Sequence, residues 1–125
     1  MGKFAVRTNE KGTRFNLKAG TGEIIATSQM YKSEKSCMAG IASVAKNAPI
    51  AAVENQTVEG FEKQPHPKFE VYEDKGGQFR FRLKAKNGQI IAASEGYKSL
   101  KSCLNGIESV RKNAADSPVV KEEAK

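Results

Sequence analysis

Residues 14–48 of this 125-residue sequence recur 66 positions later, with identical residues at about two thirds of the positions. A duplication of this size predicts two copies of one structural unit. Each copy, at about 55 residues, buries too little apolar surface to be comfortably stable alone. We therefore expect the copies to share one core around a pseudo-twofold axis, so that the monomer resembles a fused homodimer.

Each copy contains a pattern typical of two antiparallel strands. Residues 80–85 alternate cations with apolar side chains, which in a strand places the cations on one face of a sheet and the apolar groups on the other. The Asn87-Gly88 pair that follows is typical of a two-residue type I′ turn, because both central residues of that turn need a positive φ. Residues 14–28 show the same pattern, with residues 20–22 as the turn.

The type I′ turn also predicts which residues lie opposite each other. It pairs Lys84 with Ile91, and the same reasoning places Ile25 opposite Lys18. Residues that are paired across two strands share a face of the sheet. We therefore expect both isoleucines on the outer face, together with the cations.

A helix follows the strands in each copy. Ser33 and Ser99 are favourable N-cap residues, and the first helix should end near Asn47. Apolar residues recur at i, i+4 and i+7, which predicts one buried face per helix and makes both cysteines core residues. These faces consist of Cys37, Ile41 and Val44 in the first copy and Cys103, Ile107 and Val110 in the second.

Composition changes divide the chain into segments. Short apolar stretches at residues 50–53 and 118–120 predict one further strand in each copy. The polar segment before the second copy contains Gly60, Pro65 and Pro67, which indicates a linker. The resulting division is a first repeat at 1–58, a linker at 59–67, a second repeat at 68–120 and a frayed tail at 121–125.

Taken together, these motifs resemble a known family. Residues 81–91, Ser94-x-x-Tyr97-x-Ser99 and residues 106–113, with the same elements in the first copy, are similar to the YegP-like proteins, small bacterial proteins with one or two copies of a roughly 50-residue domain. The resemblance implies an α+β fold of tandem βββα(β) repeats. It implies a single antiparallel sheet whose last strands are exchanged between the repeats, with both helices packed on one face. It brings no catalytic or cofactor-binding residues with it.

Charge and composition narrow the possible functions. The net charge is +7, and residues 1–50 and 68–115 each carry +5, which favours an anionic partner. The only histidine, His66, is distant in sequence from both cysteines, and no catalytic triad, carboxylate pair or phosphate-binding glycine loop is present. We therefore expect no enzyme, metal or cofactor. The absence of a long apolar segment and of a secretory signal predicts a cytoplasmic protein without membrane contact.

The first candidate site is the outer face of the sheet, where cations surround a tyrosine. Lysine and arginine bind phosphates and aromatic rings stack on bases, so this combination fits single-stranded nucleic acid. The alternative is a solvated face on which the lysine and arginine stems cover the isoleucines. The residues of this candidate site are Arg14, Lys18, Tyr72, Arg80, Arg82 and Lys84.

The second candidate site is the start of each helix. Lysine near a helix N-terminus opposes the macrodipole, and a bound small anion would compensate for this. The alternative is a plain serine cap with solvated lysines. The residues are Lys32, Ser33, Lys35 and Ser36 in the first copy and Lys98, Ser99, Lys101 and Ser102 in the second.

A third feature is a row of small residues on each helix. Gly40 and Gly106 lie inside the expected helices, where glycine costs about 1 kcal/mol relative to alanine. Close approach of another backbone would explain them, and we expect that neighbour to be the other helix. A ligand groove is the alternative.

These observations favour a small non-enzymatic interaction module with an unknown protein partner. The second hypothesis is a protein that binds nucleic acid through its cationic outer face. A third is a small-anion sensor at the helix starts. Titration with single-stranded RNA and DNA at several salt concentrations separates the first two, because phosphate contacts weaken steeply with salt.

Overall fold

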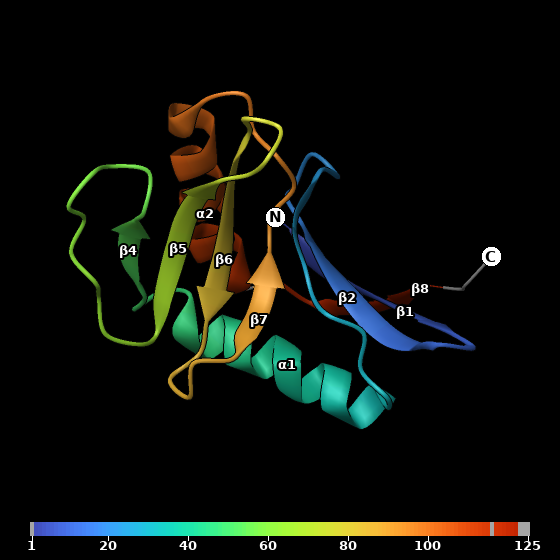
Figure 1. Cartoon of the computed structure of the whole chain (residues 1–125). Coiled ribbons are helices and arrows are strands. Elements are labelled where there is room, and N and C mark those ends of the chain that lie inside the picture. Colours follow the sequence, from blue (N-terminus) through green and yellow to red (C-terminus); the bar gives the residue numbers. More distant parts are fainter. Residues whose placement is uncertain (1, 116, 123–125) are drawn as a thin grey trace.

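The computed structural model describes residues 2–115 and 117–122, which form one eight-stranded sheet and two helices (Figure 1). The first repeat contains β1 (Lys3–Asn9), β2 (Gly12–Lys18), β3 (Ile24–Thr27), α1 (Glu34–Asn47) and β4 (Ala52–Asn55). The second repeat contains β5 (Lys68–Glu73), β6 (Phe79–Lys84), β7 (Ile90–Ala93), α2 (Leu100–Ala114) and β8 (Val119–Glu122).

The two repeats exchange their last strands. The sheet order is β4-β5-β6-β7-β3-β2-β1-β8, so β4 of the first repeat pairs with β5 of the second, and β8 returns to pair with β1. This exchange confirms the topology implied by the family resemblance. The expected antiparallel pairing holds for the six inner strands, whereas the two exchanged strands pair in parallel, because each follows a helix that crosses back over the sheet.

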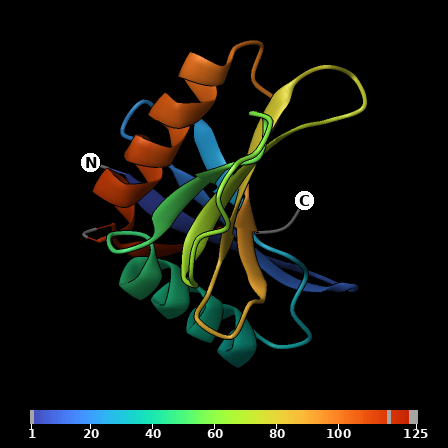
Figure 2. The ribbon, with the colours of Figure 1, turned by 60° about the vertical axis from the view of Figure 1, so that its left-hand side comes forward.

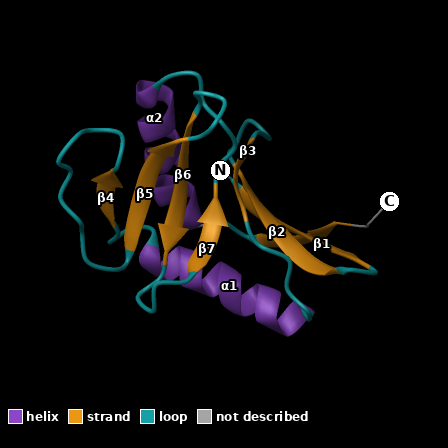
Figure 3. Ribbon diagram, in the orientation of Figure 1, coloured by secondary structure: helices purple, strands orange, loops and turns teal. Residues whose placement is uncertain are grey.

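Both helices cover one face of the sheet (Figures 2 and 3). α1 contacts β2 of its own repeat and β7 of the other, while α2 contacts β6 of its own repeat and both β2 and β3 of the other. The buried apolar residues of the two repeats therefore form a single cluster, which confirms the shared core. In the described part of the chain, neither helix is long and apolar enough to cross a membrane.

The hairpin turns differ from the predicted type I′ turn. The Gly88 N–H donates to the Ala85 carbonyl and the Ala85 N–H donates to the Gln89 carbonyl, each at 2.9 Å. Ala85 and Gln89 therefore close the hairpin, and the three residues 86–88 connect them. Gly88 has φ +84°, whereas Asn87 is not in the positive-φ region. This is the three-residue hairpin in which one left-handed glycine completes a bulge. The first repeat has the same turn, with Gly22 at φ +90°.

The bulge changes the register by one residue. Lys84 pairs with Ile90, so the predicted pairing with Ile91 is wrong. Ile91 consequently faces the helices and is buried, whereas Ile90 is exposed on the outer face. The first repeat shows the same shift, because Lys18 pairs with Ile24 and Ile25 is in the core. A one-residue slip always moves a side chain to the opposite face of a sheet.

The exchanged strands begin later than the apolar runs indicate. β4 spans Ala52–Asn55, two residues beyond the predicted stretch at 50–53, and Ile50 is exposed. β8 spans Val119–Glu122, so residues 121 and 122 of the predicted frayed tail belong to a strand. Residues 123–125 of that tail lie outside the described residues.

Candidate functional site

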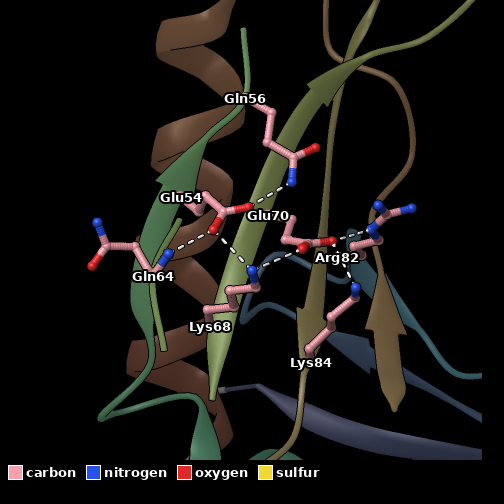
Figure 4. A network of polar contacts seen from close by, with 7 residues as sticks. All are labelled: Glu54, Gln56, Gln64, Lys68, Glu70, Arg82 and Lys84. Carbon is pink, nitrogen blue, oxygen red and sulfur yellow. Dashed lines mark hydrogen bonds and ion pairs between the residues drawn. The ribbon is translucent and has the colours of Figure 1, made fainter. Parts of the chain in front are cut away.

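A network of buried charges joins the two repeats at the β4 edge of the sheet (Figure 4). Glu54 on β4, and Lys68 and Glu70 on β5, all lie on the outer side of the sheet, yet they are only 2%, 6% and 3% exposed. The Lys68 ammonium lies between the two carboxylates, 2.8 Å from Glu54 Oε1 and 3.1 Å from Glu70 Oε2. Every charge in this group is therefore paired, which is the condition under which ionised side chains can be buried.

The segment between β4 and β5 completes the environment of Glu54. This segment arcs out beside β4 and returns to the start of β5 (Figures 1 and 2). The Gln64 backbone N–H donates to Glu54 Oε1 at 2.7 Å, and the Gln56 side-chain amide donates to Oε2 at 2.6 Å. The residues predicted as a linker thus include a backbone donor that holds the segment to the exchanged strand.

The network perturbs the acidity of its members. Burial favours the neutral acid at Glu54, but hydrogen bonds from Lys68, Gln56 and the Gln64 amide outweigh it and lower the pKa to about 2. The hydrogen bond from Lys68 to Glu54 raises the pKa of Lys68, even though burial opposes this. At Glu70, too, burial is overcome by the cations, and the pKa is lowered. All three groups are therefore charged at neutral pH.

The cations of the predicted nucleic-acid face on β6 are paired with carboxylates. Arg80 Nε donates to Asp74 at 2.6 Å, and Arg82 Nε donates to Glu70 at the same distance. Lys84 Nζ lies 3.2 Å from Glu70 Oε1. The predicted cations on β6 are thus brought together, but each is part of an ion pair with Asp74 or Glu70, and neither acid is among the predicted site residues.

The remaining members of the predicted face have different surroundings. The Tyr72 ring is half-buried, and the Arg82 guanidinium carbon lies 4.9 Å from its centroid, a distance typical of a cation–π contact. In the first repeat, Arg14 is exposed and Lys18 is half-buried. These two residues lie on β2, on the other side of the β3–β7 junction from Tyr72.

Each arginine on β6 uses only part of its hydrogen-bonding capacity. Arg80 and Arg82 both donate to a carboxylate through Nε. Among the described residues, no hydrogen bond from the Nη groups of either side chain is found. Since a guanidinium has five N–H donors in a rigid fork, each side chain is oriented by its carboxylate while its Nη groups stay available for an external acceptor.

The helix starts are ordinary serine caps. Ser33 Oγ accepts the Ser36 backbone N–H, and Ser99 Oγ accepts the Ser102 backbone N–H, each at 3.1 Å. This confirms the predicted N-caps and uses one of the free donors of each first turn. All members of the predicted anion sites are exposed: Lys32, Ser33, Lys35, Ser36, Lys98, Ser99, Lys101 and Ser102.

The helix glycines accommodate tyrosines, not the other helix. A Cβ placed on Gly40 would lie 2.3 Å from Tyr31 Oη, and one on Gly106 would lie 2.4 Å from Tyr97 Oη. Each tyrosine also stacks on a core phenylalanine, so its ring has little room to move. The prediction of close approach at the glycines is right, but the predicted neighbour is wrong.

The described residues contain no group of three or more metal-ligating side chains. Cys37 and Cys103 are free and buried in the core. Burial raises the pKa of the Cys103 thiol to about 11, and burial together with nearby Glu34 raises the pKa of Cys37. Both thiols are therefore protonated core residues, as their position on the helices predicted.

A pocket of about 370 Å³ opens where the two repeats meet on the outer face. The junction there is short, because β3 and β7 pair only at Thr27 and Ala93. Equivalent positions of both repeats line this seam pocket, namely Thr27, Ser28 and Gln29 from the first and Ala93, Ser94 and Glu95 from the second. The wall is completed by Arg80, Ile90 and Ala92, which come from the second repeat alone.

The similarity to known proteins covers both repeats. A family model described as a domain of unknown function (DUF1508) matches twice, at residues 9–55 and 74–120. A UPF0339 protein of Stutzerimonas stutzeri is 71% identical over 48 residues, which are 38% of this chain and only 43% of that protein. The UPF0339 protein YegP of Yersinia pestis is 42% identical over 123 residues, which cover 98% of this chain and 96% of that protein.

A solved structure shows the same fold. The solution NMR structure of the E. coli protein of unknown function yegP matches with a TM-score of 0.79 and 35% sequence identity. The match covers 99% of this chain and 95% of that one. Both repeats and the strand exchange between them therefore lie within the matched region.

Proposed function

The chain belongs to the UPF0339 (YegP) family of DUF1508 proteins. We propose that it is a non-catalytic binding module whose outer sheet face contacts a protein partner. The observation that carries the proposal is the arrangement of charge on this face. Arg80 and Arg82 are held in fixed orientations by Asp74 and Glu70, which prepares directed donors at little entropic cost to binding.

The position of the helices supports the same face. Both helices pack on the opposite side of the sheet, so the outer face over β6, β7 and β3 is left open (Figures 2 and 3). The exposed Ile90 adds an apolar group that lines the same pocket as the oriented Arg80. Oriented arginine beside an apolar residue is the composition of a protein-binding surface, since arginine is enriched there and lysine is depleted.

Affinity capture with surface variants tests the proposal. The full chain, immobilised, is exposed to a lysate of the source cells, and Arg82→Glu is compared with Lys101→Glu, an equal charge change at an exposed site on α2. We expect Arg82→Glu to lose the captured protein and Lys101→Glu to retain it, with or without nuclease treatment. Capture that is insensitive to Arg82→Glu would contradict the proposal.

Single-stranded nucleic acid is the second candidate. The Arg82 guanidinium over the Tyr72 ring provides a cation beside a π-face, which is a combination that nucleic-acid-binding proteins use. The carboxylates next to Arg80, Arg82 and Lys84 favour the protein partner over this candidate, because they reduce the positive field that would attract a run of phosphates. Titration with oligonucleotides of RNA and DNA at 20 and 150 mM salt decides between them. Saturable binding whose affinity falls with salt and with Arg82→Glu would favour nucleic acid.

A further inference from the structure

We propose that the seam pocket binds the carboxylate of an aspartate or glutamate side chain of the protein partner, with the Arg80 guanidinium as its anchor. This inference rests on the proposed function and specifies the group that the outer face recognises. The pocket of about 370 Å³ is large enough for one such side chain. Because equivalent residues of both repeats line it, the pocket exists only when the repeats are paired.

Arg80 is held in position before any partner arrives. Its Nε donates to Asp74 Oδ2 at 2.6 Å, and Asp74 Oδ1 in turn accepts the backbone N–H groups of Gly76 at 2.9 Å and Gln78 at 3.0 Å. The β5–β6 turn therefore fixes the carboxylate, and the carboxylate fixes the guanidinium. The Arg80 side chain is still 37% exposed, and its Nη groups have no hydrogen bond in the described part of the chain. A carboxylate in the pocket can therefore accept N–H groups that are already oriented.

The other wall of the pocket is apolar. Ile90, whose exposure is 43%, lines it together with Ala92 and Ala93. The methylene groups of a glutamate or aspartate side chain can pack against these residues while the carboxylate reaches Arg80. Ser28 and Ser94 offer no competing hydroxyl donor, because each donates its O–H to the carbonyl of the next residue at 2.8 Å.

The distribution of positive and negative side chains around the pocket favours a single carboxylate over a chain of phosphates. Glu95 borders the pocket, and Asp74 is paired with the Arg80 guanidinium. A strand of closely spaced phosphates would bring several negative charges near these two carboxylates, whereas one carboxylate brings a single negative charge to the Arg80 guanidinium. The net charge of +7 attracts acidic partners to the protein as a whole.

The test is an NMR titration of the isotope-labelled full chain with three probes: a capped tetra-glutamate peptide, a capped tetra-glutamine peptide and a twelve-residue oligothymidylate. We expect saturable shifts of the Arg80 Nε–H signal and of the Thr27, Ala93 and Glu95 amides with tetra-glutamate only. Arg80→Gln should weaken this binding about tenfold, as expected for loss of a charge-assisted hydrogen bond. Arg80→Lys should weaken it as well, because lysine retains the charge but lacks the guanidinium fork.

The repeat provides the matched control. Arg14 is the equivalent arginine of the first repeat, is exposed and does not line the pocket, so Arg14→Gln should retain tetra-glutamate binding. An equal loss in Arg14→Gln would overturn the inference in favour of general charge attraction. Stronger shifts of the pocket amides with oligothymidylate would overturn it in favour of phosphate. If tetra-glutamate does not bind but capture of the partner still depends on Arg82, this inference fails and the proposed function stands.

Discussion

The Glu54 carboxylate and the Lys68 ammonium lie 2.8 Å apart across the junction between β4 and β5, and the two residues come from different repeats. In the other half of the protein, Val120 of β8 and Ala5 of β1 stand opposite each other where Glu54 and Glu70 do here, so both carboxylates of the network are replaced by apolar residues. The ion pair therefore distinguishes the two exchanged strands. β4 would lose its buried partners if it occupied the place of β8.

Replacing Glu54 with glutamine should destabilise the fold by about 3 kcal/mol at pH 7, because removal of one member leaves a buried charge poorly compensated. The pKa of Glu54 is lowered from 4.5 to about 2 in the folded protein, so its contribution is complete above pH 4.5 and is lost as the pH falls toward 2. Denaturant unfolding at pH 7, 4.5 and 3 should show the two proteins converging in acid. Glu59→Gln, which removes an exposed carboxylate of the same segment, should be neutral. A stability difference that is constant down to pH 3 would contradict this explanation.

Arg111 on α2 should stabilise the exchanged strand β4. Its Nη2 donates to the Ala51 carbonyl, and its guanidinium carbon lies 5.6 Å from the centre of the Phe69 ring. We expect Arg111→Ala to cost about 2 kcal/mol and to accelerate hydrogen exchange at the Ala52 amide, which is bonded to the Pro67 carbonyl. Lys112→Ala, at the exposed neighbouring position, should change neither quantity. Normal protection of the Ala52 amide in Arg111→Ala would show that β4 is held by other contacts.

Substituting alanine for Gly40 or Gly106 should destabilise the protein by about 1–3 kcal/mol, despite the better helix propensity of alanine. The reason is the tyrosine hydroxyl less than 2.5 Å from the position of the new methyl group. Thermal unfolding of both variants measures the effect. Gly76→Ala is the control, since its methyl group would meet Asp74 Oδ1 at an ordinary 3.5 Å. Increased stability in Gly40→Ala would mean that the Tyr31 ring moves at little cost.

The two cysteines should react with a thiol reagent only when the protein opens. Both are fully buried, and burial raises the pKa of Cys103 to about 11, so little thiolate forms at pH 8. Labelling with a chromogenic disulfide should therefore be slow in buffer and rapid, with two equivalents consumed, in guanidinium chloride. Fast labelling of the native protein would show that the core under α1 or α2 opens readily.

The repeat, the strands and the capped helices could be predicted from sequence because each depends on local chemistry. Ser33 and Ser99 cap their helices as predicted, and the apolar stripes of both helices are buried. The register of the hairpins could not be predicted in the same way. A glycine that follows asparagine also fits the three-residue turn, and the single residue it adds moved Ile91 from the outer face to the core.

The acidic half of the candidate site was missed for a different reason. Alternation along the strand that begins at Lys68 predicts that Lys68 and Glu70 point away from the helices, which is correct, but it treats that direction as solvent. Their burial depends on the segment between β4 and β5, which packs against Glu54 through a backbone amide and therefore leaves no side-chain pattern. The one available signal was an acid and a lysine that lie diagonally across from each other, two register positions apart, once the strands are exchanged.

The pairing of β8 with β1 also has a consequence for synthesis on the ribosome. Phe4 pairs with Val119, which is translated 115 residues later. Until then the N–H and C=O groups along one edge of β1 have no strand beside them, and such an edge can pair with another nascent chain. The yield of folded protein should therefore depend on rapid translation and on chaperone binding during that interval. This dependence should be stronger than for a protein whose first strand pairs on both edges soon after it is synthesised.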